Sequence, residues 1–189
     1  MRFEKIDPGK GFWDAYHEGL KSADVPAPTV GQPSPPKLPD GFSHELQLWV
    51  LDRTSLESGG APRFLSWRFV DIKNGRLVLC EVRGDPPKFL SIAYGEKVDG
   101  IATIVSESLK KLDSDPNTYE PRLLTAAVVL TEALWLVPRS GPENSRVITL
   151  NTAAREVQVG KAVSLSEFIT RLQSASKRLT PHSEIPDQP

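Results

Sequence analysis

Apolar residues change their spacing along this chain, which separates an N-terminal helix from an extended linker. Residues 11–23 carry apolar side chains at helical spacing with charged residues between them, which predicts a short amphipathic helix. Six prolines follow between residues 26 and 39, and such a segment favours an extended polyproline conformation. We therefore expect residues 1–23 to form a helical arm and residues 24–42 to form a linker. The apolar stripe of the arm consists of Phe12, Trp13, Tyr16 and Leu20.

An alternating pattern typical of strands begins after the linker. Residues 44–51 alternate apolar and polar side chains, as a half-buried strand does. The next two strand-like segments, 64–72 and 76–83, are separated by Asn74-Gly75. This dipeptide is a strong hairpin signal, because both of its residues tolerate a positive φ.

The turn at Asn74-Gly75 also predicts the register of the hairpin. A two-residue turn places Phe69 opposite Cys80 and Arg68 opposite Glu81, and directly opposed residues share a face. The sequence therefore predicts a cross-strand ion pair between Arg68 and Glu81 on a solvated face, which also holds Ser66 and Arg83. The other face is apolar and holds Leu65, Trp67, Phe69, Val78, Cys80 and Val82.

The second half of the chain gives less uniform signals. Residues 88–94 fit a further strand, and residues 98–112 show helical spacing. Residues 123–132 are too uniformly apolar for periodicity to decide. We interpret them as a buried helix that Pro121 opens and that continues into a strand at residues 133–137.

The last elements predicted are two strands and a helix. The strands are expected at residues 146–150 and 156–159. Ser164 and Glu167 form a capping box in front of an amphipathic helix. Residues 181–189 lack an apolar period, and we expect them to be a flexible tail.

These elements predict an α+β domain over residues 43–180. Its sheet is expected to be mostly antiparallel, with five to six strands packed against two to three helices, behind the N-terminal helix and the proline-rich linker. The order of the elements resembles that of the small dimeric secretion chaperones and related adaptor folds. This resemblance rests on element order alone, and it implies a protein-binding function.

Composition narrows the class of protein. The 189 residues are 39% hydrophobic and 25% charged, as in soluble globular proteins, and a core of this size needs no disulfide or metal. The single Cys80 lies in an apolar run, which is typical of a buried thiol in a reducing compartment. No apolar stretch reaches the roughly 18 residues of a membrane span, and the first residues do not resemble a signal peptide. We therefore expect a cytoplasmic protein with no membrane contact.

The sequence contains no pattern that identifies a reaction. The net charge of −1 comes without a basic stripe, so we expect no nucleic-acid partner. His17, His44 and His182 lie far apart in the chain, and Gly160-Lys161 lacks the rest of a phosphate-binding loop. The prediction is that the protein has no catalytic residue, no cofactor and no bound metal.

One acidic pattern gives an alternative function. Asp71, Glu81 and Arg83 resemble the Asp…Glu-x-Lys pattern of restriction-endonuclease-like folds, which implies a divalent cation, although Arg83 replaces the lysine. The predicted register places Asp71 on the face opposite to Glu81 and Arg83, so the two carboxylates converge only if a bulge shifts the register. The alternative is thus a hydrolase or metal-dependent nuclease whose site is assembled from residues distant in sequence.

The leading hypothesis is a non-enzymatic protein-interaction module, such as an accessory, adaptor or chaperone-like protein. It would contact a protein partner, or a second copy of itself, through the arm or the exposed face of the sheet. Phe12, Trp13 and Tyr16 have two interpretations: the arm packs on its own domain, or its aromatic side chains anchor in a partner. The sequence leaves the partner and the oligomeric state open.

Overall fold

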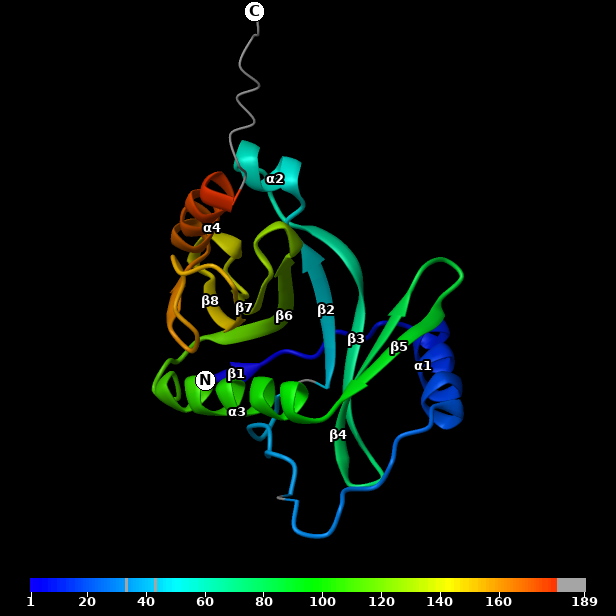
Figure 1. Ribbon diagram of the computed structural model, residues 1–189. Helices are drawn as coiled ribbons and strands as arrows, with labels where there is room; N and C mark the ends of the chain where they lie inside the picture. The colour runs from blue at the N-terminus through cyan, green and yellow to red at the C-terminus, as the bar shows by residue number, and fades with distance from the viewer. Residues whose placement is uncertain (33, 43, 180–189) are drawn as a thin grey trace, which may run out of the picture.

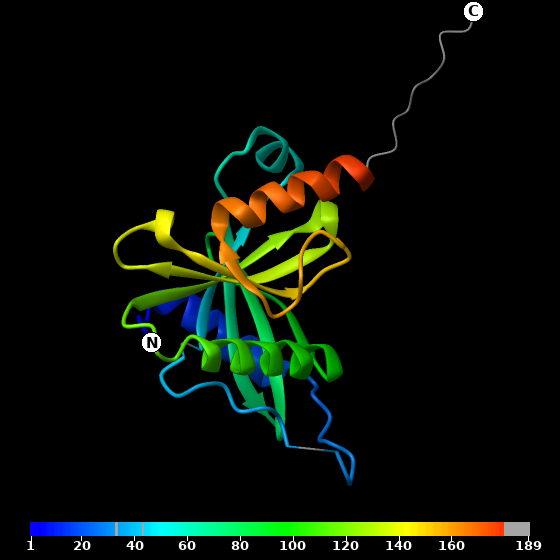
Figure 2. The same cartoon turned by 90° about the vertical axis from the view of Figure 1, so that its left-hand side faces the viewer.

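The computed structural model describes residues 1–32, 34–42 and 44–179. Within these residues, nine strands form one mixed sheet and four α-helices pack on it (Figure 1 and Figure 2). The helices are α1 (Lys10–Ser22), α2 (Arg53–Ser58), α3 (Glu96–Lys111) and α4 (Leu165–Leu179), with 3-10 turns η1 (Ala127–Val129) and η2 (Pro142–Asn144). The strands are β1 (Arg2–Phe3), β2 (Glu45–Val50), β3 (Arg63–Lys73), β4 (Arg76–Arg83), β5 (Lys88–Tyr94), β6 (Thr118–Ala126), β7 (Thr131–Pro138), β8 (Arg146–Asn151) and β9 (Ala162–Ser164).

The sheet consists of two antiparallel halves joined by one parallel pair. Its strand order is β5-β4-β3-β2-β6-β7-β8-β9, and β1 also pairs with β6. The pairs β2–β6 and β1–β6 are parallel, whereas the other pairs are antiparallel. The prediction of a mostly antiparallel sheet of five to six strands is therefore wrong in the number of strands, and the sheet is mixed.

The largest error concerns residues 123–132, which we interpreted as a buried helix. They contain the end of β6, the turn η1 and the start of β7. Strands that neighbouring elements cover on both faces read as continuous apolar runs, so their alternation disappears. Leu124 and Ala126, both 1% exposed, and Leu134, fully buried, fit this explanation.

Pro121 does not open a helix but lies within β6. On one side of β6 it is opposite Leu136 of β7. On the other side, β1 pairs with residues 118–119 and β2 pairs with residues 122–125. Pro121 therefore lies between the two parallel partners, where the missing N–H interrupts neither ladder.

Two further predictions near the C-terminus have different outcomes. The strand expected at residues 156–159 is wrong, because these residues form turns and β9 follows instead. The capped last helix is confirmed, since the Glu167 N–H donates to Ser164 Oγ at 3.1 Å. The tail predicted at residues 181–189 lies outside the described residues.

The predicted hairpin register is confirmed. Phe69 is opposite Cys80, Arg68 is opposite Glu81, and Lys73 is opposite Arg76. Asn74 and Gly75 have φ values of 50° and 77°, the left-handed region that the turn requires.

Helices cover both faces of the sheet. The cross-strand pairs Trp67–Gln47, Gln47–Arg122 and Arg122–Trp135 place Trp67 and Trp135 on the same face. Near Trp67 this face packs against α1, and near Trp135 it packs against α4. The opposite face packs against α3 through Val98, Val105 and Leu109. We call these the α1–α4 face and the α3 face.

The N-terminal helix α1 packs on the sheet of its own chain, over β4 and β5 (Figure 1). Gly19 is buried, and it faces the Phe89 ring so closely that an added Cβ would lie 2.0 Å from Phe89 Cγ. A glycine in mid-helix lowers helix stability by about 1 kcal/mol relative to alanine. Here it allows the helix to approach the strand.

The start of the linker is bound to the tip of the β3–β4 hairpin. Asn74 Nδ2 donates to the Val25 carbonyl at 2.7 Å, and Arg76 Nε donates to the Pro26 carbonyl at 2.8 Å. Lys73 Nζ donates to the carbonyls of Leu20 and Ala23. An extended segment leaves its carbonyls unpaired, and the turn supplies the donors.

Two glycine substitutions test the packing of α1. We expect Gly19→Ala to lower the free energy of unfolding by about 1–3 kcal/mol, because the new methyl group forces α1 away from Phe89. The matched control is Gly100→Ala in α3, where an added Cβ meets nothing within 4 Å. It should raise stability by about 0.5–1 kcal/mol. Urea unfolding measures both, and equal gains in the two variants would contradict the close packing of α1.

Candidate functional site

The aromatic residues of α1 lie against the α1–α4 face of their own sheet. Tyr16 is 3% exposed and stacks on Phe69 with ring centroids 4.4 Å apart. Trp13 meets the same Phe69 edge-on at 5.0 Å, and Phe12 lies 6.3 Å from Trp67. Leu20 is partly buried in the same cluster. In this structure the four residues proposed as an interaction stripe therefore complete a core of their own chain.

A polar contact lies inside this aromatic cluster. The Tyr16 hydroxyl donates a hydrogen bond to Asp71 Oδ2, and Asp71 Oδ1 accepts from the Ile72 N–H at 2.6 Å. Burial, followed by the hydrogen bond and charge of Asp71, raises the pKa of Tyr16 above its usual value. Burial, helped by Asp71, raises the pKa of the Cys80 thiol to about 12. Both groups therefore remain protonated in the folded protein at neutral pH.

The acidic pattern on the hairpin does not form one site. Asp71 lies on the α1–α4 face and binds Tyr16, whereas Glu81 lies on the α3 face. Glu81 Oε2 pairs with Arg68 Nη2 at 2.8 Å, and its Oε1 accepts from Ser66 Oγ at 2.8 Å. Arg83 shares the face of Glu81 and is exposed. The described residues contain no group of three side chains able to hold a metal ion.

The face around Arg68 and Glu81 is less solvated than expected. Their side chains are only 23% and 13% exposed. Alternation along one hairpin shows which residues share a face, but not whether a distant helix covers that face. Here α3 packs against the apolar part of the same face, and this leaves a small pocket beside Arg68.

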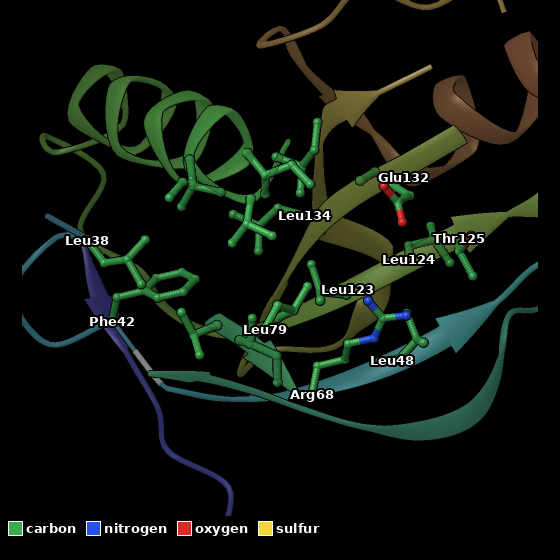
Figure 3. Close-up of a pocket in the computed structure, with 18 of the residues that line it drawn as sticks. Leu38, Phe42, Leu48, Arg68, Leu79, Leu123, Leu124, Thr125, Glu132 and Leu134 are labelled. Carbon is green, nitrogen blue, oxygen red and sulfur yellow. The ribbon is translucent and has the colours of Figure 1, made fainter. Parts of the chain in front are cut away.

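This pocket lies between α3 and the sheet and has a volume of about 60 Å³ (Figure 3). Leu38 and Phe42 lie at one end, and most of the wall is formed by leucine, valine and alanine side chains. Pockets for small-molecule ligands usually measure about 300–1,000 Å³. The space fits a water molecule or a small apolar group, so it is a gap in the packing and not a metabolite site.

The other end of the pocket is polar. Arg68 and Glu132 point toward one another there (Figure 3). Within the described residues, Arg68 Nε is buried without a hydrogen-bond partner. Glu132 Oε2 lies 3.3 Å from Lys97 Nζ, an ion pair that connects β7 to the first turn of α3. These charges hold α3 over the pocket.

Arg122 on the α1–α4 face lies between two tryptophans. Its guanidinium carbon is 4.6 Å from the Trp49 ring centroid and 5.0 Å from that of Trp135. Glu120 holds the same guanidinium through two hydrogen bonds of 2.5 and 3.0 Å. The residues come from β2, β6 and β7, so this cluster connects the two halves of the sheet. Sequence reasoning missed it, because the strand pairing that creates it was not predicted.

Strand β5 forms one edge of the sheet, and its outer side pairs with no strand among the described residues (Figure 1). Leu90 is 52% exposed and Tyr94 is 40% exposed, although both lie in a seven-residue strand. A long edge strand with exposed apolar side chains is a template for pairing with another chain. We therefore take the outer edge of β5 as the candidate functional site.

The opposite edge of the sheet is protected. Strand β9 has three residues and leads directly into α4, and very short edge strands are a common protection against unwanted pairing. In β5 the register shifts between Phe89 and Ser91, which leaves residues 91–94 as a regular segment. The sequence predicted β5 as a strand, but the strand order that makes it an edge came only from the structure.

Within the described part of the chain, every helix is too short or too polar to cross a bilayer.

The raised pKa values of Cys80 and Tyr16 predict a loss of stability at alkaline pH. The unfolded chain releases the Cys80 proton from about pH 8.5, whereas the folded chain keeps it up to about pH 12. The unfolded state then binds fewer protons, so the free energy of unfolding falls as pH rises through this window. In Cys80→Ala the fall should begin only near pH 10, where unfolded tyrosine ionises. Urea unfolding between pH 7 and 11 tests this, and identical profiles would contradict it.

Comparisons with known proteins add no functional assignment. The chain matches no family model, no curated protein and no solved structure. Any functional proposal therefore depends on the geometry of the chain itself.

Proposed function

We propose that this protein is a non-enzymatic protein-interaction module that binds an extended protein segment along the outer edge of β5. One observation carries the proposal: a seven-residue edge strand exposes Leu90 and Tyr94 beside backbone groups that no other strand covers. An added strand gains backbone hydrogen bonds, while alternate side chains provide specificity.

The packing of α1 supports the same proposal. The inner side of β5 is held by Phe89 and Ile92, which lie in the cluster formed with α1. The strand is also paired with β4 along its length. A rigid edge loses little conformational entropy when a partner strand binds, which favours affinity. The arm thus acts in the proposed function as a support behind the edge, and the edge replaces it as the contact surface.

The acidic pattern no longer supports the alternative of a metal-dependent nuclease. Asp71 and Glu81 project from opposite faces of the β3–β4 hairpin, so they do not meet at one cation. The proposal is accordingly restricted to binding.

Site-specific photo-crosslinking in the cells that make the protein tests the proposed edge. A photoreactive phenylalanine analogue at position 90 should give adducts with a polypeptide. The same analogue at Leu130, which is 68% exposed on the turn between β6 and β7, is the matched control and should give none. Both positions are solvent-exposed, so neither substitution should affect folding.

The specificity of the adducts decides the outcome. Adducts at position 90 should disappear when Tyr94→Lys is added, because the added charge removes an apolar contact from the same edge. Equal adducts at positions 90 and 130, or none at position 90, would overturn the proposal.

A further inference from the structure

We infer that the partner of the β5 edge is a second copy of this chain, paired antiparallel through β5 itself. This inference rests on the proposed function. It names the partner of the same edge, and it follows from the pattern of exposed apolar and charged residues along the strand.

Symmetry restricts how two β5 strands can pair. A two-fold axis perpendicular to the sheet places the same face of both copies on the same side. Directly opposed residues share a face, so one residue of β5 must lie opposite itself. Near the centre of the strand this leaves three registers, which centre on Ser91, Ile92 or Ala93.

The register centred on Ile92 pairs the exposed residues of the strand best. It places Leu90 opposite Tyr94 of the second copy, which covers the two exposed large apolar side chains of the edge. The same register places Lys88 opposite Glu96 of the second copy. By symmetry each contact occurs twice, so the dimer gains two apolar pairs and two opposite-charge pairs.

The charges at the two ends of the strand are available for this pairing. Lys88 and Glu96 are both exposed, and neither takes part in an ion pair among the described residues. Glu96 follows β5 directly, as the first residue of α3.

The other two registers lack this complementarity. Centring on Ser91 places Lys88 opposite Tyr94 and Leu90 opposite Ile92. Centring on Ala93 places Leu90 opposite Glu96, which sets an apolar side chain against a charge. The pattern of the strand therefore selects the Ile92 register. One strand pair buries a small area, so we expect a dimer with a Kd on the order of micromolar.

Disulfide trapping tests the register with the full chain. In the Ile92 register Ser91 lies opposite Ala93 of the second copy, and opposed Cα atoms in an antiparallel pair are about 4.5–5.5 Å apart. This distance suits a disulfide. Under mild oxidation, Ser91→Cys alone and Ala93→Cys alone should remain uncrosslinked, whereas their equimolar mixture should give a disulfide-linked dimer. The native Cys80 is fully buried and stays in place.

The three samples separate the registers. A dimer from Ser91→Cys alone would indicate the Ser91 register, and a dimer from Ala93→Cys alone would indicate the Ala93 register. Either result would overturn the proposed pairing of Leu90 with Tyr94.

A charge exchange gives a second, independent readout. In analytical ultracentrifugation, Lys88→Glu and Glu96→Lys should each weaken the dimer about three- to thirtyfold, because like charges then oppose each other twice. The double variant should restore the Kd of the native chain. Circular dichroism checks that each variant is folded, and a double variant as weak as the single ones would contradict the pairing.

Failure of this inference differs from failure of the proposed function. A chain that stays monomeric at about 100 μM, gives no trapped dimer, and still forms photo-adducts at position 90 with another protein would overturn the second copy as partner. The edge itself would then remain the binding surface. A monomer without any adduct at position 90 would overturn both.

Discussion

The parallel pairing of β2 with β6 is the constraint on which the rest of this fold depends. It joins the antiparallel half β2 to β5 to the antiparallel half β6 to β9, and the whole segment from α2 to α3 lies between the two strands in sequence. Arg122, held between Trp49 and Trp135 by cation–π contacts, reinforces this seam from the α1–α4 face. Each such contact contributes about 0.5–2 kcal/mol. Because this pair sets the strand order, it also determines that β5 is an edge.

The parts of the fold that could be predicted from the sequence are those set by neighbouring residues. The Asn74-Gly75 turn sets the hairpin register, and the Ser164–Glu167 box sets the start of the last helix. The strand β6 could not be predicted in the same way, because burial from both sides removes its alternation. Pairing between β2 and β6 is decided by contacts distant in sequence, which no local pattern records.

The same distinction explains the candidate site. The sequence identified residues 88–94 as a strand, and it identified the arm as amphipathic. It did not show that the arm packs on the inner side of this strand, where Gly19 allows close contact with Phe89. Aromatic residues at helical spacing indicate that a helix has a partner surface, but they do not show whether that surface belongs to the same chain. Here Tyr16, Phe69 and Cys80 form it.

Evolution usually protects a sheet edge by shortening it, charging it or covering it, and the two edges of this sheet differ in that respect. The edge at β9 is short and continues into α4, whereas β5 is long, carries Leu90 and Tyr94 in exposed positions, and has its only lysine at its first residue. An acidic residue follows the other end of the strand. In an antiparallel pair of two such strands, each lysine meets the acid of the other copy, so the charge that prevents pairing with an unrelated strand favours pairing with itself. A residue that looks like protection in one chain becomes a specificity determinant in two.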